Sequence, residues 1–163
     1  MKGVVVIGAG KIGATVAGLL ASTGDYQVTL ADRSPEVLGN LDRHQVIRVM
    51  AADAEDSLKL VDLLNGQFAV LNAAPFRLTK HIAEAARAAG THYLDLTEDV
   101  VSTRRVRELA ANANTAFFPQ CGLAPGFVSI GPSIWRRVSR CSTASDCGSG
   151  RFLNIPPTPS TTT

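Results

Sequence analysis

Three glycines near the amino terminus have a spacing that can hold a dinucleotide. Residues 8–13 read G-x-G-x-x-G, between a short β-branched run and a helical pattern. The first glycine permits a tight turn, the second lets the backbone approach a pyrophosphate, and the third allows close packing of helix on sheet. The pyrophosphate would lie against the free N–H groups of that helix. We expect cofactor contacts from Gly8, Gly10, Lys11, Ile12 and Gly13; the alternative is a glycine-rich turn that binds nothing.

An acidic residue and a basic residue, Asp32 and Arg33, follow the next predicted strand. Asp32 lies 19 residues after Gly13, where a carboxylate accepts hydrogen bonds from the adenosine ribose and repels a 2′-phosphate. Arg33 leaves the alternative open, because a guanidinium can stack on adenine, bind a phosphate or lie in solvent. We therefore predict NAD as the cofactor, with NADP possible.

Small residues follow the fourth predicted strand in the order Asn72, Ala73, Ala74 and Pro75. In an open parallel sheet the ligand lies outside the carboxyl ends of the strands, near the point where strand order reverses. The alanines would let a cofactor approach the backbone, and Asn72 could present its amide to it. A plain strand-to-helix turn is the alternative.

The remaining polar candidates carry weaker signals. Asp95 and Glu98 follow the fifth predicted strand and are the best-placed acid or base, although the pattern identifies no catalytic residue. Thr97 or Asp99 can instead cap the next helix. Cys121 is expected to be a small buried thiol rather than a nucleophile. We expect no functional role for His44, His81 and His92, a solvated face for Arg104, Arg105 and Arg107, and no metal site.

The elements that must position these residues alternate between strand and helix. Strands are predicted at 3–8, 27–31, 45–50, 68–72, 92–96 and 115–119. Helices are predicted at 11–22, after a Ser34 cap, at 56–64, around 78–89 and at 99–113. Short connections imply right-handed parallel crossovers. We therefore predict an α/β fold, a Rossmann-type doubly wound sheet of six parallel strands in the order 3-2-1-4-5-6. On the first helix, Ile12, Val16, Leu19 and Leu20 form the expected buried face.

Composition excludes several classes of protein. The chain has 163 residues, 45% of them apolar and 18% charged, with a net charge of +2. This balance is too weak to favour nucleic acid, and no apolar run approaches the length of a membrane helix. The run at 4–7 is too short for a leader peptide. Three cysteines without a leader indicate a reducing compartment, so we expect a cytoplasmic protein.

Four segments together resemble the saccharopine dehydrogenase family. They are VVVIGAGKIG, LNAAPF, HYLDLTED and PQCGLAPGF, and the resemblance spans residues 1–130. It implies an NAD- or NADP-dependent oxidoreductase that acts on the C–N bond of an amino-acid-derived secondary amine, with a homodimer for the full-length parent. It also implies that the glycines hold the pyrophosphate, that Asp32 holds the ribose, and that the turn at 72–75 borders the nicotinamide half.

The resemblance stops near Ile130, which suggests two parts. We expect a dinucleotide-binding domain at 1–126 and a truncated start of the substrate domain at 127–163. The last 33 residues carry four basic and one acidic side chain. Regrouping their codons by one base permits VGALPQYPSNAFNY, which looks like substrate-domain sequence. We hypothesise a frame change near codon 131 and a poorly ordered tail; a native disordered tail or a short appendage are the rivals.

An incomplete substrate domain would leave cofactor binding with little or no turnover, because a nicotinamide without a substrate wall lacks positioning and water exclusion. The alternative function is a non-catalytic dinucleotide-binding module that senses NAD(H).

Overall fold

The computed structural model describes residues 1–39 and 47–122. All of them belong to one compact unit. His44 and the predicted 127–163 segment lie outside the described residues, so the boundary at 126 and the frame-change hypothesis stay predictions. None of the helices in the described ranges has the length and apolar character to cross a membrane.

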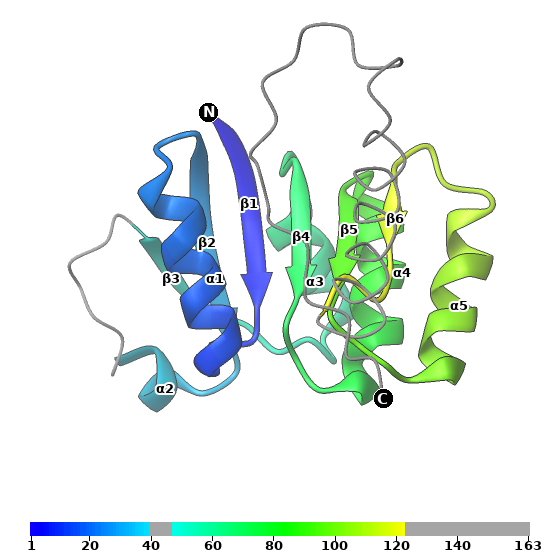
Figure 1. Cartoon of the computed structure of the whole chain (residues 1–163), viewed down its shortest axis with the longest axis horizontal. Coiled ribbons are helices and arrows are strands. Elements are labelled where there is room, and N and C mark those ends of the chain that lie inside the picture. The colour runs from blue at the N-terminus through cyan, green and yellow to red at the C-terminus, as the bar shows by residue number, and fades with distance from the viewer. Residues whose placement is uncertain (40–46, 123–163) are drawn as a thin grey trace, which may run out of the picture. The chain divides into compact units, whose positions relative to one another are not determined.

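Six parallel strands form one sheet, in the predicted order β3-β2-β1-β4-β5-β6 (Figure 1). Their bounds are β1 Lys2–Ile7, β2 Tyr26–Asp32, β3 Ile47–Ala51, β4 Ala69–Asn72, β5 His92–Asp95 and β6 Phe117–Phe118. The predicted strands are confirmed, although β6 is shorter than the predicted 115–119. The doubly wound fold is therefore as predicted, with β1 at its centre.

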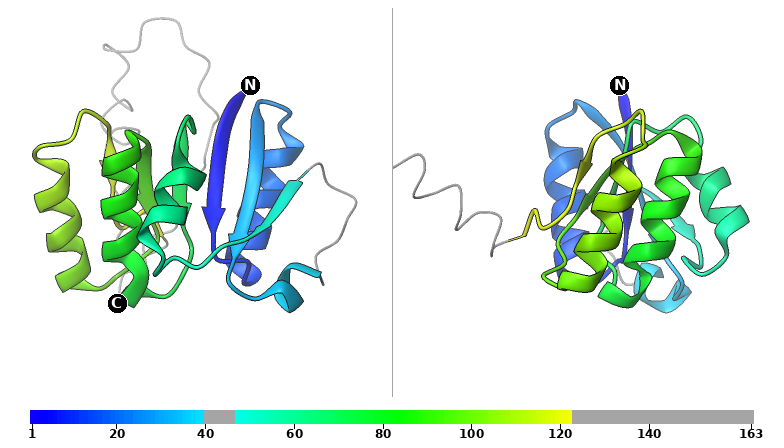
Figure 2. Two further views of the ribbon diagram at one scale, coloured as in Figure 1. Left: turned by 180° about the vertical axis from the view of Figure 1, so that it is seen from behind. Right: turned by 90° about the vertical axis from the view of Figure 1, so that its right-hand side faces the viewer.

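Helices cover both faces of the sheet. They are α1 Lys11–Ser22, α2 Pro35–Gly39, α3 Ser57–Leu64, α4 Thr79–Ala89 and α5 Val100–Ala110, with a 3₁₀ turn, η1 Phe76–Leu78, before α4. Figures 1 and 2 show α1 on one face and α3, α4 and α5 on the other. Helices lie on both faces because right-handed crossovers place them on opposite faces on the two sides of the point where strand order reverses.

The buried side chains of β1 explain why both faces are covered. Val5 and Ile7 pack in the layer under α3, α4 and α5, whereas Val6 packs in the layer under α1. A strand with apolar residues on both sides reads as a continuous hydrophobic run, as this one does. The central strand thereby packs between two apolar layers.

The buried face of α1 differs from the prediction. Its bounds are as expected, but Ile12 and Leu19 are each 64% exposed, and the buried residues are Gly13, Ala17 and Gly18. The helix approaches the sheet so closely that only small residues fit beneath it. The predicted buried face was therefore wrong for Ile12 and Leu19. Its other two residues, Val16 and Leu20, are partly buried.

The strand register aligns the ends that carry the candidate residues. Ile7 pairs with Ala31 on one side and with Asn72 on the other, and Asn72 pairs with Asp95. The carboxyl ends of four neighbouring strands thus meet along one edge of the sheet. The loops that follow them, after β1, β2, β4 and β5, must form the candidate site.

Candidate functional site

The turn between β1 and α1 is held rigidly against its neighbours. The Gly8 N–H donates to the Ala31 carbonyl at 2.8 Å, and the Ala73 N–H donates to the Ile7 carbonyl at 2.8 Å. Gly8 has a φ of +103°, and a Cβ there would come within 2.8 Å of the Ala73 carbonyl group. Only glycine meets both constraints.

The other two glycines of the motif serve different purposes. Gly13 is buried, and an added Cβ would overlap the carbonyl oxygen of Gly8. Among the described residues, none would lie within 4 Å of a Cβ at Gly10. Gly13 is therefore required by the packing of α1, whereas the fold itself does not require Gly10.

The amino end of α1 lacks an internal cap. Its N-cap, Gly10, makes no side-chain hydrogen bond, and its first turn holds no acidic residue. In contrast, α3 and α5 are capped by the carboxylates of Asp56 and Asp99, which accept from Lys59 and Ser102 N–H groups. The N–H groups and positive dipole end of α1 thus suit an external anion.

Asp32 ties the glycine turn to the end of β2. Its carboxylate accepts the N–H of Ala9 at 2.8 Å and the N–H of Ser34 at 2.9 Å. A carboxylate offers about four acceptor positions, so about two remain. These can receive the two hydroxyls of a ribose while the turn stays fixed.

These features surround one cavity of about 510 Å³, a size typical of small-molecule sites. It brings together seven of the predicted cofactor residues: Gly8, Gly10, Asp32, Arg33, Ala73, Ala74 and Pro75. Lys11, Ile12, Gly13 and Asn72 are outside its lining. Lys11 and Ile12 still carry N–H groups of the uncapped turn, and Gly13 packs beneath it.

Asn72 is directed inward rather than toward the cavity. The residue is 2% exposed, and its amide donates to the hydroxyls of Thr79 and Tyr93 at 3.2 and 3.3 Å. Its carbonyl oxygen accepts the N–H of Ala74 at 3.0 Å. Asn72 therefore shapes the turn that borders the cavity, and its amide is already engaged.

Sequence reasoning missed part of the lining. Ala52, Asp53, Ala54 and Glu55, which follow β3, reach the cavity, as do Arg77 and Leu78. The available signal was position, since β3 lies beside β2 and its following loop must lie on the same edge. Among the described residues, no group of His, Cys, Asp and Glu could hold a metal ion.

Asp95 lies inside the protein rather than at a cleft. It is 0% exposed and accepts the Tyr93 hydroxyl at 2.9 Å and the N–H groups of Thr97 and Gln120, each at 3.0 Å. Burial and the adjacent Asp95 charge raise the pKa of Tyr93 far above its usual value. The expectation that Asp95 faces a ligand is therefore corrected to a positioning role, whereas Glu98 is exposed.

The cysteine and the two described histidines lie away from the cavity lining. Cys121 is exposed, whereas a buried thiol was expected. The pKa of its thiol is raised, mainly by partial desolvation and also by the negative charge of Asp95. The segment turns outward there because Asp95 holds the N–H of both Gln120 and Cys121. The His92 ring accepts the N–H of Ala116 at 3.0 Å, and His81 is partly buried on α4.

Comparison with known proteins agrees with this geometry. The family model described as "Saccharopine dehydrogenase NADP binding domain" matches residues 4–118. Apo saccharopine dehydrogenase (L-Glu forming) from Saccharomyces cerevisiae superposes with a TM-score of 0.76 at 20% identity, over 86% of this chain and 32% of that chain. Apo scyllo-inositol dehydrogenase from Lactobacillus casei gives 0.64 at 17%, over 86% and 40%. No curated protein sequence matches significantly.

Proposed function

The chain belongs to the saccharopine dehydrogenase family, and on that premise we propose that its 510 Å³ cavity binds NADP(H). The whole protein would then be an oxidoreductase that acts on the C–N bond of an amino-acid-derived secondary amine. The chain spans about a third of the yeast dehydrogenase that it resembles in fold.

One observation carries the proposal. The uncapped amino end of α1, the open space at Gly10 and the Asp32 carboxylate all border a single cavity. A pyrophosphate at the helix end would replace the missing cap. From there the 3′-hydroxyl of the adenosine ribose, which NADP(H) leaves free beside its 2′-phosphate, would reach an acceptor position that Asp32 has left. The residues present therefore fit a dinucleotide in charge, space and hydrogen bonding.

The choice of NADP over NAD rests on Arg33 and on the family description. The negative charge of Asp32 by itself disfavours a 2′-phosphate, and for this reason the sequence predicted NAD. Two N–H groups already bond that carboxylate, which weakens its repulsion. The exposed Arg33 lines the same cavity, where a guanidinium can bind a phosphate. The matching family model is also described as NADP-binding.

The bound nicotinamide would accept or donate a hydride at the carbon that bears the amine nitrogen. The part of the chain described here supplies binding and orientation. The glycine turn and the Ala73–Ala74 backbone are fixed by hydrogen bonds from Gly8 and Ala73, so the cavity wall is preorganised. Asp95 positions the segment that leaves β6.

Titration of the full chain with NADPH and NADH, followed by cofactor fluorescence, tests the proposal. We expect Arg33→Gln to weaken NADPH binding by roughly tenfold, the value of one charged phosphate contact, and to leave NADH binding unchanged. Arg48→Gln is the matched control, because Arg48 is an exposed residue of β3 outside the cavity lining.

Two results would contradict the proposal. If neither dinucleotide binds, the site assignment fails. If Arg33→Gln affects NADPH and NADH equally, the specificity argument fails. Incubation with NADP⁺ and saccharopine, the test amine, then separates the two candidate functions. An oxidoreductase would reduce NADP⁺, whereas a non-catalytic sensor would bind NADPH but give no reduction.

A further inference from the structure

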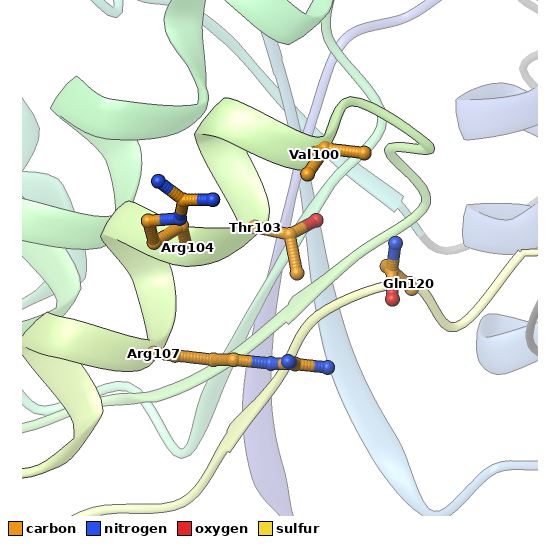
Figure 3. Close-up of a pocket in the computed structure, with 5 residues that line it drawn as sticks. All are labelled: Val100, Thr103, Arg104, Arg107 and Gln120. Atoms are coloured by element: carbon orange, nitrogen blue, oxygen red, sulfur yellow. The ribbon is translucent and has the colours of Figure 1, made fainter.

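A second cavity, of about 220 Å³, lies beside α5 and the segment after β6. Figure 3 shows its five lining residues, Val100, Thr103, Arg104, Arg107 and Gln120. None of them lines the dinucleotide cavity. The proposed function leaves this cavity unexplained.

The cavity has positive charge that the described part of the chain does not neutralise. Of the three arginines on α5, Arg105 pairs with Glu84 at 3.0 Å and with Glu108 at 3.1 Å. Arg104 and Arg107 make no ion pair with any described residue. In Figure 3 the Arg107 side chain extends past Thr103 toward Gln120, and Arg104 lies on the same helix one turn away.

Two acids on neighbouring segments, Asp99 and Asp95, are already engaged. The Asp99 carboxylate caps α5 by accepting the Ser102 N–H at 2.7 Å. Asp95 is buried and holds three donors. Neither carboxylate lines the cavity, so an anion that enters would meet the guanidinium groups first.

The backbone at Gln120 provides an independent observation. Among the described residues Gln120 is the one non-glycine with a positive φ, 62°. Such a conformation costs energy and persists where the surroundings fix it. The Asp95 side chain accepts the Gln120 N–H at 3.0 Å, and the Asp95 carbonyl accepts the Cys121 N–H at 2.8 Å. This arrangement holds the Gln120 side chain at the cavity opposite α5 (Figure 3).

We propose that this second cavity binds the oxyanion group, phosphate or carboxylate, of a small ligand. Arg107 and Arg104 supply charged donors, and the Gln120 amide supplies a neutral donor. Val100 forms an apolar wall for the rest of the ligand. The proposal goes beyond the dinucleotide function and does not depend on it.

The test uses the full ¹⁵N-labelled chain and inorganic phosphate or succinate as the added anion, at constant ionic strength. We follow the backbone amides of Thr103 and Gln120 and the side-chain amide of Gln120 by NMR. Each titration is repeated with NADPH present, so that phosphate at the amino end of α1 is distinguished residue by residue from phosphate at α5.

We expect saturable shifts at Thr103 and Gln120 that weaken by roughly tenfold in Arg107→Gln and by a smaller factor in Arg104→Gln. Arg87→Gln is the control: it makes the same charge change at an exposed residue of α4, outside both cavities. A response to phosphate alone assigns a phosphate ligand, and a response to succinate alone assigns a carboxylate. Absent shifts, or equal shifts in Arg107→Gln and Arg87→Gln with a preserved spectrum, would overturn the proposal.

Discussion

Replacing Gly10 by valine should separate ligand binding from folding. A Cβ at this position has no neighbour within 4 Å in residues 1–39 and 47–122, and the φ of −66° and ψ of 177° suit any residue. The stability cost is then confined to losing glycine as the N-cap of α1, about 0.5–1 kcal/mol. The valine methyl groups would occupy space beside the uncapped N–H groups. We expect NADPH affinity to fall by tenfold or more, about 1.4 kcal/mol.

Gly13→Ala is the matched change at the other end of the motif. Its Cβ would overlap the Gly8 carbonyl oxygen and lie 3.3 Å from the Ala73 Cβ. Overpacking typically costs about 1–3 kcal/mol, and the upper end applies here because the obstacle is backbone. With a total stability of about 5–15 kcal/mol for a typical domain, this variant should lose much of its stability and its binding together.

Urea unfolding followed by circular dichroism and NADPH titration by fluorescence measure the two effects. With an m-value of about 1–3 kcal/mol/M, the Gly13→Ala midpoint should fall by roughly 1 M or more, and the Gly10→Val midpoint by much less. Unchanged NADPH affinity in Gly10→Val would refute the site. A Gly10→Val midpoint as low as that of Gly13→Ala would refute the distinction between the two glycines.

Two other changes test the packing around the site. Asp95→Asn should lower the free energy of unfolding by about 1–3 kcal/mol, because the Tyr93 hydroxyl loses its acceptor; an unchanged urea midpoint would show that this bond contributes nothing. Acid should also destabilise α5, since hydrogen bonds from Ser102 lower the Asp99 pKa below 3.8. A lowered pKa gives stabilisation that is complete above the ordinary value and lost as pH falls through the folded one. Asp99→Asn should remove this part of the acid dependence of helix content.

The sequence predicted topology well because strand order depends on patterns that need no partner. The buried run of β1 and the helix that begins near Asp56 can each be predicted from its own short stretch of sequence. The packing face of α1 could not be found in this way. Periodicity counts large apolar residues, and Ile12 and Leu19 dominate that count, whereas the helix packs through Gly13, Ala17 and Gly18. Small residues carry almost no hydrophobic signal.

The candidate site shows the same division between position and orientation. Asn72 and Asp95 lie at the predicted edge of the sheet, as their strand ends required. Their side chains turn inward because Thr79 and Tyr93 offer buried hydroxyls, and these partners meet them only in the folded sheet. Arg77 and Asp53 were missed for the complementary reason, since no local motif marks the loops that carry them to the cavity.

The central place of β1 has a consequence for how the protein is made. β2 pairs with one side of β1 through nearby sequence, but the other side waits for β4, where Val4 meets Ala69. During synthesis the first half of the sheet can therefore assemble while one edge of β1 stays open. An open apolar edge invites pairing with other chains. We therefore expect the nascent chain to be most open to pairing with other chains until β4, which ends at Asn72, has left the ribosome.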